Sequence, residues 1–182
     1  MHRAKPLFFS WENLGDLEVG RPQLGDMAPV LVYRLLQYAL KAVLAQKLGV
    51  AATKEIFIQA GRLAGEEFCR EVLDCDQPFE RFFPELVRKL EEWKIGLLQI
   101  EDLQPETMEM TLTVAEDLDC SGLPVCHQTL CDYDEGFLAG ILSSYTGQEF
   151  QVEEISCWAT GDRICRFKVT VAHPPSREDS RP

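Results

Sequence analysis

Hydrophobic residues recur at helical spacing through the first half of the chain. Residues 29–48 place apolar side chains three or four positions apart, and Gly49 then ends the pattern. Residues 52–73 repeat it, with Gly61 and Gly65 one helical turn apart. Small residues at that spacing allow a neighbouring helix to approach closely. The pattern therefore predicts two helices, the second of which packs tightly against another.

A third helical pattern is followed by a change to alternation. Residues 76–94 carry apolar residues on one side, and the internal Pro84 is expected to kink or break this helix. Residues 96–103 and 106–115 then alternate between apolar and polar positions, which is typical of strands. These two segments predict a hairpin.

The last part of the chain predicts one more helix and a second hairpin. Residues 131–145 have a helical pattern, whereas 149–158 and 162–171 are rich in β-branched and aromatic residues. Helices come first and strands afterwards, with one helix before the last hairpin. We therefore expect an α+β two-layer domain, with the N-terminal helices packed on a C-terminal antiparallel sheet.

The length of 182 residues fits one domain with a sizeable core. Glycine and proline with interspersed apolar residues characterise residues 1–26, which we expect to form an irregular arm that lies against a dimer partner. Residues 27–171 form the predicted domain. Residues 172–182 contain three prolines and mixed charges, and we expect them to be disordered.

Composition excludes several functions. The net charge of −12 and pI near 4.7 argue against nucleic-acid binding, which requires lysine and arginine to neutralise phosphates. Apolar runs are too short for a membrane span, and the N-terminus lacks the apolar core of a signal peptide. Seven cysteines without an export signal indicate free thiols in a reducing compartment, so we expect a cytoplasmic protein.

Four residues of the C-terminal half form a candidate metal site. Cys157 and Cys165 lie four positions on either side of Gly161, so a hairpin centred there would place their side chains opposite each other. Glu154 lies on the same strand as Cys157, and Cys131 opens the predicted helix. Three thiolates and one carboxylate can fill the tetrahedral shell of a structural zinc ion, leaving no position for a catalytic water.

Two observations weigh against this site. Glu154 is three positions from Cys157 and would point to the other face of a regular strand, so the site requires a bulge or strong twist at 155–156. Free cysteines are also often simply buried, and no CxxC pair is present. Cys120 or Cys126 could replace Glu154 as the fourth ligand.

The C-terminal half resembles the 4-vinyl-reductase domain family. The resemblance rests on Cys131-Asp-Tyr-Asp-Glu-Gly136-Phe-Leu-Ala-Gly140 and on the segment from Glu153 to Phe167, and it extends over residues 106–171. This family is similar to the sensor domains of phenol-responsive sigma-54-dependent activators and, more distantly, to subunits of the TRAPP vesicle-tethering complex. The resemblance implies the NO-signalling/Golgi-transport ligand-binding fold and a homodimer.

The resemblance also implies two sites. Three cysteines and a glutamate bind structural zinc in the phenol sensors, and the intervals of that pattern agree with Cys131, Glu154, Cys157 and Cys165. Beside the zinc, an apolar cavity is implied. Its corresponding positions are Met108, Met110, Phe137, Ile141 and Val152. The tryptophan and histidine that hold the phenol hydroxyl have no match here, so we do not predict phenol sensing.

Three classes of function follow. The first is a binding or sensing module for a hydrophobic small molecule, with a structural zinc site. The second is an assembly protein of the TRAPP-like type. The third is a tetrapyrrole 4-vinyl reductase, for which the sequence offers neither a nucleotide-binding glycine motif nor a convergent titratable cluster. No catalytic residue is predicted, and whether the chain is an enzyme stays open.

A homodimer is also predicted from the first helix. This helix carries Tyr33, Leu36, Leu40 and Leu44 in addition to an inward apolar face. A helix that is apolar nearly all round needs cover on both sides, and pairing about a two-fold axis would supply it.

Overall fold

The computed structural model describes residues 9–172. The elements, in chain order, are η1 (Trp11–Leu14), α1 (Leu17–Gly20), α2 (Val30–Leu48), α3 (Val50–Val72), α4 (Phe79–Glu92), β1 (Leu97–Gln104), β2 (Glu109–Ala115), α5 (Asp132–Thr146), β3 (Phe150–Ser156), η2 (Trp158–Thr160) and β4 (Cys165–Val171). Residues 1–8 of the predicted arm and 173–182 of the predicted disordered tail lie outside the described residues.

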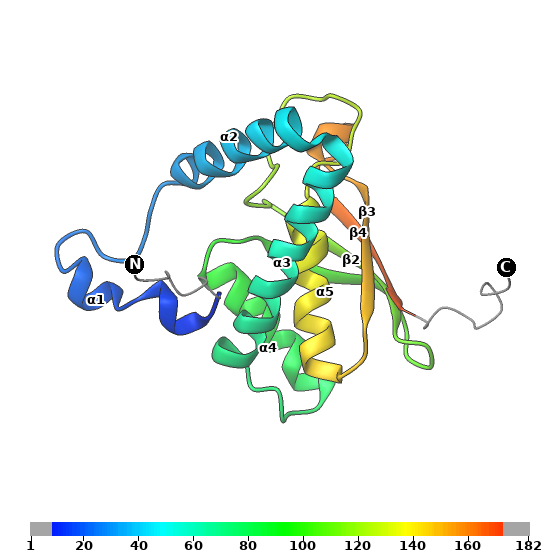
Figure 1. The fold of residues 1–182 in the computed structure, drawn as a ribbon. Coiled ribbons are helices and arrows are strands. Elements are labelled where there is room, and N and C mark those ends of the chain that lie inside the picture. The colour runs from blue at the N-terminus through cyan, green and yellow to red at the C-terminus, as the bar shows by residue number, and fades with distance from the viewer. Residues whose placement is uncertain (1–8, 173–182) are drawn as a thin grey trace, which may run out of the picture.

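The strands form one antiparallel sheet in the order β1-β2-β4-β3. Helix α5 connects β2 to β3 and packs between the sheet and α3 (Figure 1). Alternate residues of the central strands, such as Leu112 and Phe167, point into the core and are fully buried. On the other face, Arg166 pairs with Glu101 at 2.9 Å. The predicted α+β fold, with helices packed on an antiparallel sheet, is confirmed.

Helices α3 and α5 pack with their backbones in contact. A Cβ atom built on Gly61 would lie 2.0 Å from the carbonyl oxygen of Tyr133, and one on Gly65 would lie 2.1 Å from that of Phe137. On α5, a Cβ on Gly136 would lie 1.9 Å from the carbonyl oxygen of Ile58. No side chain other than hydrogen fits at these positions. The tight packing predicted from the two glycines of α3 is confirmed, and its partner is α5.

Helix α4 is not broken at Pro84, one of the two outcomes expected for it. The helix runs without interruption from Phe79 to Glu92 with the proline inside it. Proline removes the hydrogen bond to the carbonyl of Glu80, four residues earlier, and its ring crowds that carbonyl, a cost confined to one turn near the start of the helix. Phe82 and Leu86 on either side of Pro84 are buried in the core, and this burial holds the turn in place.

Helix α2 projects from the body of the domain (Figure 1), and polar side chains attach it there. Arg34 donates hydrogen bonds to the carbonyl oxygens of Leu118 and Ser121, at 2.8 and 3.0 Å. Lys41 forms an ion pair of 2.6 Å with Asp132 at the start of α5. Gln37 is the buried residue of this helix. The inward face of α2 is therefore polar, contrary to the apolar inward face expected from the sequence.

Many apolar side chains of α2 point to solvent instead. Leu31 and Leu35 are each 71% exposed, and Leu36 is 69% exposed. Within residues 9–172, no helix combines the length and apolarity that crossing a membrane requires.

Candidate functional site

Four cysteine side chains converge where α5 begins. Cys131 is the N-cap residue of α5, Cys157 follows β3, Cys165 opens β4, and Cys120 lies in the loop after β2. All four are buried. The Sγ atom of Cys165 is 3.1 Å from that of Cys120 and 3.9 Å from that of Cys131. Residues up to 45 positions apart in the chain thus share one small volume.

Glu154 joins this cluster through a bulge in β3. The pairing between β3 and β4 shifts register between Glu154 and Ser156, at the place where the sequence required a bulge. The shift turns the carboxylate toward the cysteines, where its Oε2 accepts hydrogen bonds from the backbone N–H groups of Leu130 and Cys131 at 2.9 and 3.0 Å. Its Oε1 is buried and has no hydrogen-bond partner. This orphaned oxygen fits the role of a metal ligand.

Two overlapping sets of side chains could hold a metal ion. The first set is Cys120, Cys131, Glu154 and Cys157, and the second is Asp117, Cys120, Cys131 and Cys165. Within each set, the potential ligand atoms lie within 4.8 Å of one another. Cys131, Glu154 and Cys157 belong to the first set and Cys165 to the second, so Cys131 is shared but neither set holds all four predicted ligands. The structure adds Cys120, which the sequence offered only as a substitute, whereas the alternative Cys126 is exposed.

Burial and crowding shape the acid–base behaviour of this cluster. The neighbouring thiols of Cys120, Cys157 and Cys165, together with burial, raise the pKa of Cys131. The pKa of Cys165 is lowered, because the Cys120 and Cys131 thiols hydrogen-bond to its thiolate. Burial raises the pKa of Glu154 to about 7. A divalent cation would offset these costs, because it favours the thiolate and carboxylate forms of its ligands.

A second buried group of acids lies beside the cysteines. Asp117, Asp119 and Asp134 are all buried. Asp119 accepts hydrogen bonds from the Tyr33 hydroxyl at 2.7 Å and from the Gln37 side chain. Burial, followed by the charges of Asp117 and Asp119, raises the pKa of Asp134, and the Oδ2 of Asp134 has no hydrogen-bond partner.

An apolar cavity of about 310 Å³ opens against this acidic group. Its walls come from the arm, α2, α3, the segment between α4 and β1, the loop after β2, and α5. Seven of its fourteen lining residues are aromatic, and Phe68, Trp93 and Phe137 meet there with ring centroids 5.1 to 5.3 Å apart. Asp119 and Asp134 also line it. An apolar chamber with a few polar groups is the usual form of a small-molecule site.

The structure does not bring the five predicted pocket residues into one cavity. Phe137 lines the aromatic cavity, whereas Val152 lines a separate cleft. Met110 and Ile141 are buried in the core between α5 and the sheet. Met108 precedes β2, in a turn with a φ of 56°, and so lies outside this strand, although the strand predicted over residues 106–115 includes it.

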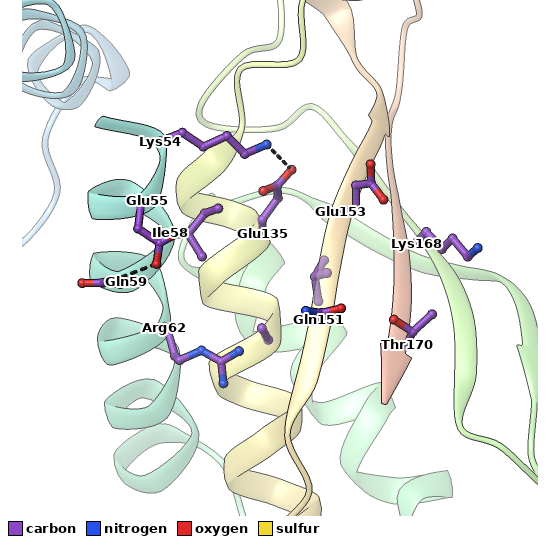
Figure 2. A pocket seen from close by; sticks show the side chains of 12 residues that line it. Lys54, Glu55, Ile58, Gln59, Arg62, Glu135, Gln151, Glu153, Lys168 and Thr170 are labelled. Atoms are coloured by element: carbon purple, nitrogen blue, oxygen red, sulfur yellow. Dashed lines mark hydrogen bonds and ion pairs between the residues drawn. The ribbon is translucent and has the colours of Figure 1, made fainter. Parts of the chain in front are cut away.

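The cleft that contains Val152 has a volume of about 540 Å³ and lies between α3, α5 and the edge strand β3 (Figure 2). Its charged groups Lys54, Arg62 and Glu135 are already paired. Lys54 lies 3.3 Å from Glu135, toward which it points in Figure 2, and Glu135 accepts the backbone N–H of Glu154. Arg62 donates to the carbonyl oxygen of Phe150 at 2.7 Å. These contacts attach β3 to the helices, so we assign the cleft a structural role.

Sequence reasoning missed the residues of the aromatic cavity other than Phe137. The walls are drawn from six separate segments, and no spacing rule connects them. One signal was available: Asp132, Asp134 and Glu135 stand in the otherwise apolar pattern of α5. Acids in a pattern that predicts burial require partners, and one of them, Asp134, lines the cavity.

Together, the fold and the cysteine cluster define a class: an α+β domain whose helices cover an antiparallel sheet, with possible metal ligands at the start of the last helix. Residues 110–171 match the family model of the 4-vinyl-reductase domain. The resemblance to the 4-vinyl-reductase family is therefore confirmed over this part of the chain.

Relatives with similar sequences come from Methanocaldococcus jannaschii. The chain is 28% identical over 148 residues to its uncharacterised protein MJ0150, an alignment that covers 81% of this chain and 79% of the relative. It is also 28% identical over 97 residues to the uncharacterised protein MJ1642, covering 53% of this chain and 58% of the relative.

Three solved structures share the fold, each with a TM-score of 0.58. A vinyl-4-reductase family protein of Methanocaldococcus jannaschii is 16% identical, with 82% of this chain and 85% of that chain covered. The phenol-responsive sensory domain of the transcription activator PoxR, solved with phenol, is 12% identical, with 80% and 76% covered. A trafficking protein particle complex subunit 3 from Naegleria fowleri, covalently bound to palmitic acid, is 15% identical, with 80% and 98% covered.

Proposed function

We propose that this protein binds or senses a hydrophobic small molecule, and that a structural zinc ion holds its C-terminal half together. The observation that carries the proposal is the aromatic cavity of about 310 Å³. Helix α5 connects the two sites, because Cys131 is its N-cap and Phe137 lines the cavity less than two turns later. Occupancy of the cavity would thus act on the helix that the metal anchors.

The solved relatives support binding. Phenol is present with the PoxR domain, and palmitic acid is attached to the trafficking subunit. An assembly role without a ligand would suit a filled core, whereas the aromatic cavity leaves room for a ligand about the size of a substituted benzene. The seven free thiols suit a reducing compartment, and we place the protein in the cytoplasm.

For the metal, we propose Cys131, Glu154, Cys157 and Cys165 as ligands. Thiolates suit zinc, and a zinc ion whose four positions are filled by protein supplies structure rather than chemistry. Replacing Cys157 with serine should remove bound zinc and destabilise the fold by several kcal/mol, because zinc binding is coupled to folding. Elemental analysis and chemical denaturation would measure both effects. Cys126→Ser is the matched control, because Cys126 is exposed and should change neither.

Glu154 and Cys120 compete for the fourth position. If Glu154 is the ligand, Glu154→Gln should weaken zinc binding far more than Cys120→Ser does, and the reverse result would assign the position to Cys120. Protein purified without chelators that contains no stoichiometric metal would refute the zinc proposal altogether.

The binding proposal predicts a change in thermal stability. A small aromatic compound should raise the melting temperature of the wild-type protein by mass action. Ala64 lines the cavity from α3, so Ala64→Leu should occupy part of it and reduce that shift. Ala52→Leu, on an exposed turn of the same helix, is the control and should leave the shift unchanged. A panel of neutral, cationic and anionic aromatic compounds with no member that binds would contradict the proposal.

We also propose a homodimer formed through α2. An apolar groove of about 200 Å³ runs between α2 and α3, and Leu36, Leu40 and Leu44 line it. Leu36 and Leu40 are themselves exposed, as are Leu31 and Leu35 of the same helix. A second copy that presents the same face would cover the groove and these leucines.

A further inference from the structure

Charge on the walls of the aromatic cavity is of one sign. Glu67, Asp119 and Asp134 line it, and none of the fourteen lining residues is lysine, arginine or histidine. Glu67 is already engaged, since it accepts the backbone N–H of Trp11 at 2.8 Å and pairs with Arg70 at 2.6 Å. Asp119 and Asp134 form no ion pair within 4.0 Å with any residue in the described range 9–172. Two buried acids of the cavity wall thus form no direct ion pair, and Asp119 is reached only by the more distant charges of Lys41 and Arg34.

Of these two acids, Asp134 has the less complete set of hydrogen bonds. Both oxygens of Asp119 accept hydrogen bonds from neutral groups, those of Tyr33 and Gln37. Asp134 is more than nine-tenths buried, and its Oδ2 has no hydrogen-bond partner. A buried carboxylate oxygen without a partner is costly, and such groups are paired or hydrogen-bonded in nearly all folded proteins. Neither Asp119 nor Asp134 belongs to the sets of side chains that could hold a metal ion, so the metal does not account for them.

The aromatic residues of the cavity wall also favour a cationic ligand. The aromatic side chains include Trp11, Tyr33, Phe68, Trp93, Tyr133 and Phe137. Aromatic faces attract an ammonium or alkylammonium group, and the attraction grows when the site excludes water. An anionic ligand would meet three acids there, and a neutral hydrocarbon would leave the Asp134 oxygen unpaired.

From this charge pattern we propose that the cavity selects a hydrophobic amine: an organic cation with an apolar, aromatic-sized body and a protonated amino group placed beside Asp134. The proposal rests on the binding function proposed above and names the chemical class of its ligand. The ammonium would form a charge-assisted hydrogen bond with the Asp134 carboxylate, and the aromatic walls would enclose the apolar body.

The test compares three probes of nearly equal shape: phenylpropylamine, phenylpropanol and phenylpropanoate. Calorimetry on the wild-type protein should show the amine binding at least about tenfold more tightly than the alcohol, as a charge-assisted contact predicts. The carboxylate should not bind. Asp134→Asn should bring the affinity for the amine down to that for the alcohol, while alcohol binding persists.

If Asp134→Asn does not fold, a second variant can still test whether the cavity prefers the amine. Trp93 is 44% exposed at the end of α4, so Trp93→Leu is expected to fold, and it should weaken the amine more than the alcohol. Alcohol that binds as tightly as the amine would overturn the amine proposal and leave the binding function standing, and so would binding of the carboxylate. Failure of all three probes would count against the binding function itself.

Discussion

Helices α2 and α3 are adjacent in the chain, and α2 is the more apolar of the two, but they attach to the protein in opposite ways. The buried residues of α3 form one stripe that includes Phe57, Gly61, Gly65 and Phe68, and this stripe lies against α5 and the core. Helix α2 buries only Gln37 among its described residues and exposes most of its leucines.

The difference shows what each helix is for. Helix α3 is part of the domain core, where backbone contact and apolar burial stabilise the fold. Helix α2 is attached to the rest of the domain by hydrogen bonds and by the ion pair between Lys41 and Asp132. Polar groups therefore fix its position, and its apolar face stays exposed, where a partner could cover it. An apolar helix is not, by its composition alone, a core helix.

The largest expected effect comes from breaking the contact between α3 and α5. Gly136→Ala places a Cβ where the Ile58 carbonyl oxygen would be 1.9 Å away, so the two backbones must separate. We expect a loss of about 3 kcal/mol or more in the free energy of unfolding, measured by denaturant titration. Gly20→Ala is the control, because no atom lies within 4 Å of a Cβ there. An unchanged stability in Gly136→Ala would show that the helices are not in close contact.

A smaller effect is expected from the polar attachment of α2. Arg34→Ala removes hydrogen bonds to the carbonyl oxygens of Leu118 and Ser121. We expect a loss of about 1–3 kcal/mol and faster hydrogen exchange in α2, with α3 unaffected. Lys47→Ala, at an exposed position of the same helix, should change little. Equal loss of protection in both helices would mean that they open together.

The smallest effect on the stability of the fold should come from the exposed face of α2. Leu36→Glu should leave the free energy of unfolding of the monomer within about 0.5 kcal/mol, because the side chain is 69% exposed. It should nevertheless convert the dimer to a monomer in light scattering, as a charge at a buried apolar interface is costly. Val125→Glu, at an exposed valine of the loop before α5, is the control for added charge. A wild-type monomer at micromolar concentration would refute the dimer.

Sequence periodicity predicted the elements closely, because each helix and strand of the core buries a regular stripe. It also required the bulge beside Glu154, since a regular strand could not direct Glu154 and Cys157 to one site. The inward face of α2 was not predictable in this way. Its contacts run from Arg34 and Lys41 to loop carbonyls and one acid, and loops have no period.

The candidate sites likewise combine residues that local sequence patterns could place with residues that only the fold brings together. Cys157 and Cys165 could be placed together because the hairpin between β3 and β4 fixes their positions, whereas the choice of Cys131 depended on the family resemblance. Cys120 lies in a loop between β2 and α5, and only the fold shows that its Sγ reaches that of Cys165. The predicted pocket included Met110 and Ile141, but both are buried in the core. The aromatic cavity depends on the arm and on α2, whose placement no local pattern specifies.

The glycine contact between α3 and α5 has a mechanical consequence. Backbone atoms that meet without intervening side chains leave no compressible layer, so we expect α3 and α5 to move as one rigid unit. A displacement of α5 caused by a ligand would therefore reach the start of α3 undiminished. There Gly49, with a φ of 87°, joins α3 directly to α2. That joint would turn a shift inside the domain into a change in the angle of its outermost helix.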